Sequence, residues 1–270
     1  MPETDEISKA LILVASLPDE DARRRGVREN LGRSDLPFAI VDSIDGRRWG
    51  DEEVSGHLSE ELNGLRLRVN QRGGVWLASG AIACALTHRD GLLANVIEDG
   101  RILCEDDIHF EPDFMDLLAR GDALEALSAI NDGVVLLNYR AQGRHLAAEK
   151  SPVARFGRYS IHKVVGRVAS GAAYFVSPDV AQKIVAYQTP LRVSADSWTT
   201  MKEAGVFSEI YLVHPLPVGT GMYPTSINYY GDRKPSGFFA YLQRSSWLRR
   251  LRWVLLRAKG TFTEHVTDWQ

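Results

Sequence analysis

Three adjacent carboxylates follow an apolar run near the middle of the chain. The stretch ILCEDDIHF places Glu105, Asp106 and Asp107 directly after apolar and thiol side chains. Like charges this close repel one another, most strongly beside a low-dielectric interior. A bound divalent cation removes that repulsion, and hard carboxylate oxygens suit Mg²⁺ or Mn²⁺. We therefore predict a metal site here, with a solvated acidic loop as the alternative.

The segments around these acids indicate how they are positioned. Short apolar runs such as KALILVAS and GVVLLN alternate with helix-compatible stretches, which predicts an α/β fold with an open, mostly parallel sheet flanked by helices. In such sheets ligands bind beyond the carboxyl ends of the strands. RILC reads as a strand, so the acids fall at that edge. Alternation along extended backbone predicts that Glu105 and Asp107 share one side while Asp106 faces the other.

Residues 76–100 show the longest helical pattern of the chain. Its apolar residues recur at three- and four-residue steps, and one histidine lies on the same face. The face comprises Ala81, Cys84, Ala85, His88, Leu92 and Val96. A lone histidine on a packed face is a satisfied core residue or a catalytic group, and periodicity does not choose between them.

The bulk composition excludes several classes of protein. The 270 residues carry a formal net charge of -3, which argues against a nucleic-acid-binding protein. The two cysteines are too few for a disulfide framework and lack metal-ligand spacing. No signal peptide and no apolar run of roughly 18 residues is evident. We expect a cytoplasmic protein.

Four blocks of the sequence carry a resemblance to a known family. LPFAIVDSIDG, GAIACALTH, ILCEDDIHFEPDF and GAAYFVSPDVAQKIV resemble, in order and spacing, the blocks of glycosyltransferase family 25. This is the group of lipooligosaccharide β-galactosyltransferases and collagen galactosyltransferases, and the similarity runs from about residue 10 to about residue 228. The resemblance implies a GT-A-like, Rossmann-type fold, a nucleotide-sugar donor and a divalent metal.

The resemblance also implies roles for individual side chains. In the family the EDD carboxylates hold the metal, so Asp107 is the expected direct ligand, and Asp106 or Glu105 would reach the metal through water or hold the donor ribose. Apart from the resemblance, His214 ends the last predicted strand and could complete the metal shell. Donor contacts are expected at Ser16, Asp45 and Arg24, the last chosen from the run Arg23–Arg25.

Glycosyl transfer needs a group that takes the proton of the attacking hydroxyl. Asp196, in RVSADSWTTMKEAG, corresponds to an acid that the family shows after its Tyr-x-x-Ser helix, and His88 corresponds to a family histidine. Both are predicted catalytic residues. An N-cap of the following helix is the alternative for Asp196.

The chain departs from the family at two positions of the second block. Ala81 stands where the family has a glutamate, and Ala83 where it has a glycine. If that glutamate contacts substrate in the family, this chain selects its substrate differently.

We divide the chain into a catalytic domain, residues 1–228, and a C-terminal extension, residues 229–270. Within the extension, residues 244–259 form a basic amphipathic pattern with tryptophans, which suits an anionic membrane surface. This motivates the hypothesis of peripheral attachment to the inner face of the cytoplasmic membrane. A helix that docks on the domain is the alternative.

The predicted function is metal-dependent, inverting transfer of a hexose, galactose from UDP-galactose, onto a saccharide acceptor. That acceptor would belong to a lipopolysaccharide, lipooligosaccharide or capsule and could be lipid-linked. Two alternatives are a nucleotidyltransferase and a non-catalytic module that binds sugar or a membrane surface.

Overall fold

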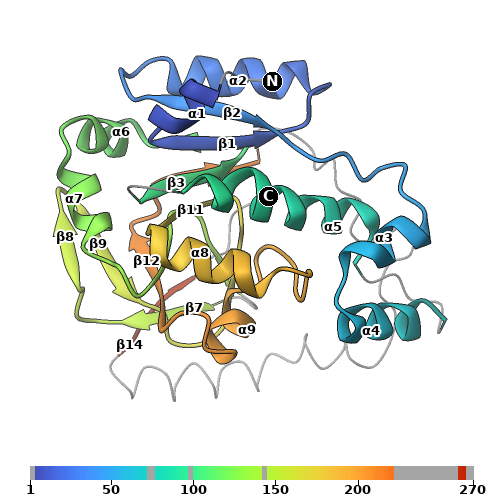
Figure 1. The fold of residues 1–270 in the computed structure, drawn as a ribbon. Helices are drawn as coiled ribbons and strands as arrows, with labels where there is room; N and C mark the ends of the chain where they lie inside the picture. Colours follow the sequence, from blue (N-terminus) through green and yellow to red (C-terminus); the bar gives the residue numbers. More distant parts are fainter. Residues whose placement is uncertain (1–3, 72–76, 97–99, 142–144, 222–260, 266–270) are drawn as a thin grey trace.

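An eight-stranded sheet forms the centre of the protein (Figure 1). The structure is a computed structural model that describes residues 4–71, 77–96, 100–141, 145–221 and 261–265. The strand order is β2-β1-β3-β11-β5-β12-β9-β8. The bounds are β2 (Phe38–Asp42), β1 (Ile12–Ser16), β3 (Arg101–Glu105), β11 (Ala173–Val176), β5 (Gly133–Leu136), β12 (Glu209–His214), β9 (Tyr159–Lys163) and β8 (Ala154–Phe156).

The sheet is mixed. Strands β2, β1 and β3 run parallel, as do β5 and β12. Strand β11 lies antiparallel between β3 and β5, and β9 and β8 continue antiparallel at the far edge. The α/β fold is confirmed, whereas a mostly parallel sheet was wrong, because a strand buried on both faces shows the same apolar run in either direction. The GT-A-like assignment stays a prediction.

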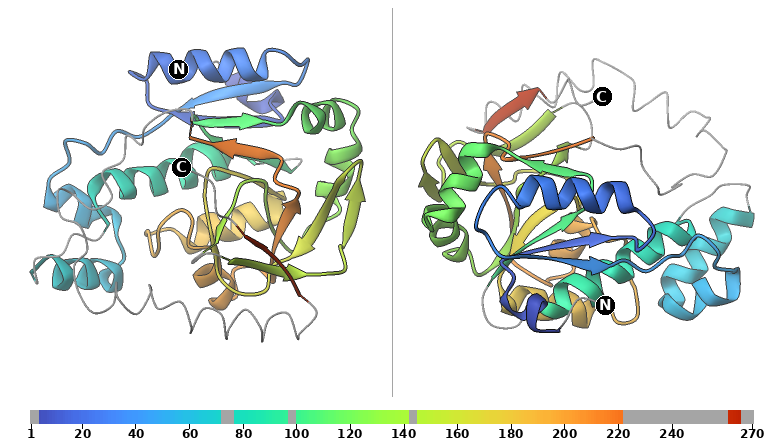
Figure 2. Two further views of the ribbon diagram at one scale, coloured as in Figure 1. Left: turned by 180° about the vertical axis from the view of Figure 1, so that it is seen from behind. Right: turned by 90° about the horizontal axis from the view of Figure 1, so that it is seen from above.

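The inner strands are buried on both faces, which explains their unbroken apolar sequences. Side chains alternate along β1, so Ile12 and Val14 enter one core while Leu13 and Ala15 enter the other. Helices cover both sides of the sheet (Figure 2). Residues of α2, α6 and α7 pack in the first core, and residues of η2, α8 and α9 in the second.

Two of the helices, α3 and α4, lie to one side of the sheet (Figure 1). The bounds are α1 (Thr4–Lys9), α2 (Asp21–Leu31), α3 (Asp51–His57), α4 (Glu60–Gln71), α5 (Ser79–Leu86), α6 (Pro112–Ala119), α7 (Asp122–Ser128), α8 (Pro178–Tyr187) and α9 (Trp198–Glu203). After α5 the chain continues as a π-helix, η1 (Thr87–Leu92), and a 3₁₀ turn, η2 (Leu93–Asn95).

Three small two-stranded sheets complete the described structure. They pair β10 (Val168–Ala169) with β6 (Arg140–Ala141), β13 (Val218–Thr220) with β4 (Ile108–Phe110), and β14 (Thr261–His265) with β7 (His145–Glu149). The predicted amphipathic helix, residues 244–259, lies outside the described residues. Within the described ranges, no helix has both the length and the apolar character that a membrane crossing requires.

We expect the aromatic cluster around α6 to carry much of the stability of the first core. Phe114 is fully buried and its ring lies 5.4 to 6.2 Å from those of Phe110, Phe156 and Tyr159. Phe114→Ala should lower the free energy of unfolding by about 3–5 kcal/mol, because it removes a large buried ring and leaves a cavity. Urea unfolding followed by circular dichroism measures this.

Val153→Ala is the control for this prediction, since Val153 is exposed. A loss for Phe114→Ala no larger than the loss for this control would contradict the packing described here.

Candidate functional site

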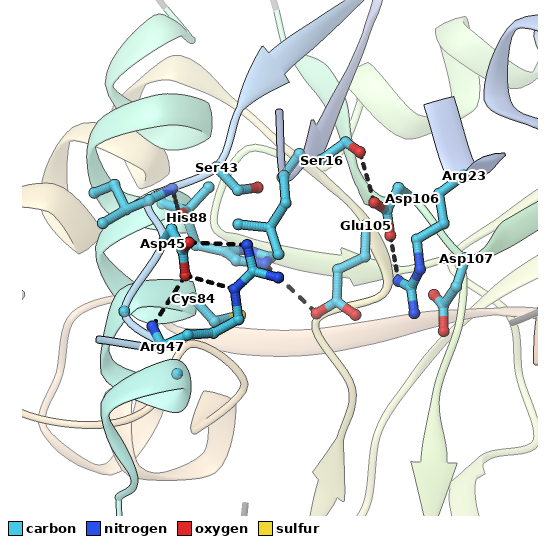
Figure 3. A pocket seen from close by; sticks show the side chains of 16 residues that line it. Ser16, Arg23, Ser43, Asp45, Arg47, Cys84, His88, Glu105, Asp106 and Asp107 are labelled. Carbon is cyan, nitrogen blue, oxygen red and sulfur yellow. Dashed lines mark hydrogen bonds and ion pairs between the residues drawn. The ribbon is translucent and has the colours of Figure 1, made fainter. Parts of the chain in front are cut away.

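A cavity lies at the edge of the sheet where β2, β1 and β3 end (Figure 3). Because these strands are parallel and adjacent, the residues that follow them meet at one place. All three acids of the run line this cavity. The lining residues are Ala15, Ser16, Leu17, Arg23, Ser43, Ile44, Asp45, Gly46, Arg47, Gly80, Cys84, Thr87, His88, Glu105, Asp106 and Asp107.

Asp106 is held by two side chains from different elements. The Ser16 hydroxyl at the end of β1 donates a hydrogen bond to Asp106 Oδ2 at 2.6 Å. The Arg23 guanidinium on α2 donates to Asp106 Oδ1, also at 2.6 Å. Both carboxylate oxygens therefore have partners, and the side chain is buried. The guanidinium of Arg23 therefore offsets part of the negative charge for which the sequence analysis predicted a metal ion.

Arg23 reaches the cavity because it lies on the packed face of α2. Arg23, Val27 and Leu31 are the buried residues of this helix and recur every four positions. Burial opposes the charge of the guanidinium. The hydrogen bond to Asp106 and the nearby charge of Asp107 outweigh that effect and raise the pKa of Arg23. The guanidinium therefore remains charged beside the acids.

Glu105 faces a different partner. Its Oε1 lies 3.6 Å from Nε2 of His88, which belongs to the π-helical segment after α5. π-Helical turns occur frequently at functional sites. Nδ1 of His88 lies 3.0 Å from the hydroxyl of Tyr174, a fully buried residue of β11. The predicted catalytic histidine is thus buried and oriented, with one face toward the acids.

Cys84 lies one helical turn before His88 and also lines the cavity. Burial raises the pKa of its thiol, and the charges of Glu105, Asp196 and Asp106 raise it further. Asp196, the predicted proton acceptor, does not line the cavity. Asp196 accepts a hydrogen bond from the Ser194 hydroxyl at 3.2 Å. The N-cap of α9 is Ser197, so the capping role considered for Asp196 was wrong.

The chain enters β11 through a strained residue. Ser170 has φ 139°, a backbone angle that residues other than glycine rarely adopt. Its hydroxyl donates to Asn138 Oδ1 at 2.7 Å, and its carbonyl accepts from Trp198 Nε1 at 2.8 Å. The next residue, Gly171, lies against the ring of His88 and the carboxylate of Glu105. These bonds fix the backbone that forms this wall.

The loop after β2 contributes an ion pair at the cavity. Arg47 bonds to both Asp45 and Asp19, and the hydrogen bond from its side chain lowers the pKa of Asp45 to about 2. Asp45, a predicted donor contact, therefore lines the cavity as a carboxylate. A Cβ on Gly46 would lie 2.7 Å from Cβ of Ala83, so the close approach of this turn to α5 requires glycine.

Besides Asp196, two further predicted site residues do not line the cavity. Arg24 bonds to the carbonyl oxygens of Ser16 and Leu17 and to Asp42, and it braces the turn after β1 without lining the cavity. His214 ends β12, which two strands separate from β3, roughly 14 Å at ordinary strand spacing. The structure does not bring either side chain to the acids.

Several lining residues were not predicted. Arg23 rather than Arg24 reaches the cavity, and Ser43, Arg47, Cys84 and Thr87 join it. The four-residue spacing of Cys84 and His88 was a usable signal for Cys84. The predicted alternation of the acids was wrong, because β3 ends at Glu105 and the next two residues form a turn. All three carboxylates therefore reach one cavity.

Comparison with known proteins adds a family relationship. A family model described as glycosyltransferase family 25 (LPS biosynthesis protein) matches residues 10–199. A protein of Haemophilus influenzae described as "Putative glycosyltransferase" is 25% identical over 189 residues. That alignment covers 68% of this chain and 60% of the relative. The chain therefore spans less than two thirds of the relative's length.

We expect Arg23→Met to lower the free energy of unfolding by about 3–5 kcal/mol, since it leaves the buried carboxylate of Asp106 without its counter-charge. Guanidinium chloride unfolding at neutral pH measures the change. The double variant Arg23→Met/Asp106→Leu should recover part of the loss.

The matched control is Arg120→Met, which breaks an exposed ion pair with Asp122 and should change stability little. Equal effects of Arg23→Met and Arg120→Met would contradict a structural role for the buried pair.

Proposed function

The chain belongs to glycosyltransferase family 25, and from this premise we propose that it transfers a hexose from a nucleotide sugar to a saccharide acceptor. The proposed donor is UDP-galactose. The proposed acceptor is a glycan of a lipopolysaccharide, lipooligosaccharide or capsule. The family description, which names LPS biosynthesis, supports this class of acceptor.

The observation that carries the proposal is the convergence of acids and cations at one strand-end cavity. The donor carries a diphosphate, and such groups bind where backbone and basic side chains converge at the carboxyl edge of an α/β sheet. Arg47 lies at this cavity with a partly exposed guanidinium. We assign it to the diphosphate, and Asp45 and Ser43 to the nucleoside.

The residues present fit a hard divalent cation, with one change from the sequence-based assignment. Mg²⁺ and Mn²⁺ are commonly held by one or two carboxylates together with substrate phosphates. Asp107 offers such a carboxylate in the cavity, whereas Asp106 is engaged with Ser16 and Arg23. When bound, such an ion would neutralise charge that develops on the leaving diphosphate.

The proposed reaction is a single displacement with inversion at the anomeric carbon. The acceptor hydroxyl gives its proton to Asp196 as its oxygen forms the new glycosidic bond, while the bond between the anomeric carbon and the β-phosphate oxygen breaks. The assignment of Asp196, which lies just before α9, is supported by its correspondence to an acid that the family shows after its Tyr-x-x-Ser helix. His88 faces Glu105 instead, and its catalytic role stays a prediction.

Thermal shift with a panel of nucleotide sugars tests the donor assignment. UDP-galactose with Mn²⁺ should stabilise the full chain by about 2.7 kcal/mol at a hundredfold excess over its Kd, and less in the presence of EDTA. Asp107→Asn should remove the metal-dependent part of the shift.

Stabilisation by a different nucleotide sugar would contradict the choice of UDP-galactose while leaving transfer intact. If no sugar nucleotide stabilised the chain and no free UDP appeared with or without Mn²⁺, a non-catalytic module would be the better description.

Asp196→Asn should lower kcat for transfer by about 10²–10⁴-fold, since the amide cannot accept the proton of the acceptor hydroxyl. The thermal shift produced by the donor should be unchanged. Release of UDP in the presence of acceptor measures the rate.

Asp116→Asn, on the exposed side of α6, is the control and should keep full activity. A similar small effect of both substitutions on kcat would remove Asp196 from the mechanism.

A further inference from the structure

Three side chains with different ligand atoms converge on one wall of the cavity. The ligand atoms of Cys84, His88 and Glu105 all lie within 4.8 Å of one another. Ligand atoms around a tetrahedral zinc ion are roughly 3.3–3.8 Å apart, given Zn–N near 2.0 Å and Zn–S near 2.3 Å. The 3.6 Å separation between His88 Nε2 and Glu105 Oε1 already falls in this range. Sγ of Cys84 lies within 4.8 Å of a ligand atom of each of these residues.

The orientation of His88 supplies a second, independent observation. The residue is 2% exposed, and Nε2 makes no hydrogen bond although it is buried. Buried polar atoms nearly always have a partner, so an exception calls for an explanation. In the tautomer protonated at Nδ1, the ring donates to the Tyr174 hydroxyl and leaves the Nε2 lone pair directed at the space beside Glu105. Metal-binding histidines are commonly oriented through their other nitrogen in this way.

The residue beside His88 and Glu105 is a glycine. A Cβ on Gly171 would lie 3.4 Å from Cε1 of His88 and 3.5 Å from Oε1 of Glu105. A side chain at this position would therefore occupy the space next to both ligand atoms. The hydrogen bonds of the neighbouring Ser170 hold this part of the backbone in place.

We propose that Cys84, His88 and Glu105 bind a divalent transition metal ion, with Zn²⁺ as the best match. The Cys84 thiol, whose pKa burial raises in the metal-free protein, would release its proton when the ion binds. A thiolate and an imidazole select zinc-like ions over Mg²⁺ and Mn²⁺, which prefer oxygen ligands alone. In the described part of the chain, no other three histidine, cysteine or acidic side chains meet as closely. This site uses different residues from Asp107, so it does not depend on the ion proposed for the donor diphosphate.

Three protein ligands leave a fourth position of a tetrahedral ion open. Because all three residues line the cavity, that position faces the same space as the acids. A water molecule or an oxygen of a bound substrate would occupy it. The site therefore has the ligand count of a catalytic zinc centre, whereas structural zinc sites have four protein ligands.

Titration of the metal-free full-length protein with Co²⁺ tests the proposal, because a cobalt–thiolate bond gives a near-ultraviolet charge-transfer band and four-coordinate Co²⁺ gives intense visible bands. We expect one equivalent of Co²⁺ to produce both, and Zn²⁺ to abolish them. Cys84→Ser should lose the charge-transfer band. Cys104→Ala, which removes the other, fully buried cysteine, should keep it.

Tyr174→Phe tests whether His88 binds the ion, because it changes the orientation of the histidine and leaves Cys84 unchanged. Removing the hydroxyl that orients His88 should weaken Co²⁺ binding roughly 10- to 100-fold while the charge-transfer band persists at saturation. Asp107→Asn should leave both the band and the affinity unchanged.

Absence of the charge-transfer band in the parent protein would overturn the proposal and leave His88 and Glu105 as a simple ion pair. A band that survives Cys84→Ser would overturn it as well. Visible bands that vanish in Asp107→Asn but persist in Cys84→Ser would place the ion at the acidic run instead. None of these results depends on transfer activity, so the proposed function is judged separately.

Discussion

The buried contact between Arg23 and Asp106 is the interaction on which the rest of the site depends. Three consecutive carboxylates beside a buried strand would repel one another, and the guanidinium opposes that repulsion from within the protein. The contact also joins α2 to the turn after β3, while Ser16 adds the end of β1. With Asp106 held in this way, Glu105 and Asp107 remain to line the cavity. The acids thus divide into one that organises the structure and two available for ligands.

The mixed sheet explains how a single cavity obtains walls of different kinds. Parallel strands β2, β1 and β3 bring their carboxyl ends to one edge, and these ends carry the polar residues. Strand β11 runs in the opposite direction, so its amino end reaches the same edge beside β3. The buried Tyr174 belongs to this strand, and Gly171 lies two residues before its start. One half of the sheet therefore supplies charges, and the reversed strand supplies the surface that orients His88.

The sequence predicted the features that local pattern determines. The strand RILC that precedes the acids and the packed face with His88 follow from apolar periodicity, and each is present. The direction of β11 was beyond such reasoning, because a doubly buried strand has no signature of direction. The choice of Arg23 over Arg24 depends on which arginine shares the face of Val27 and Leu31, and this is clear only once the bounds of α2 are known. The sequence could not show that His214 lies away from the acids, because its distance from β3 depends on strand order, which no local pattern encodes.

The backbone of Ser170 has a consequence for how this protein can change. A non-glycine residue at φ 139° stores strain on the order of 1–3 kcal/mol, and its contacts with Asn138 and Trp198 keep it there. Glycine would relieve the strain but would remove the hydroxyl that anchors the turn. Selection for higher folding stability and selection for a fixed backbone beside His88 therefore favour different residues at this position.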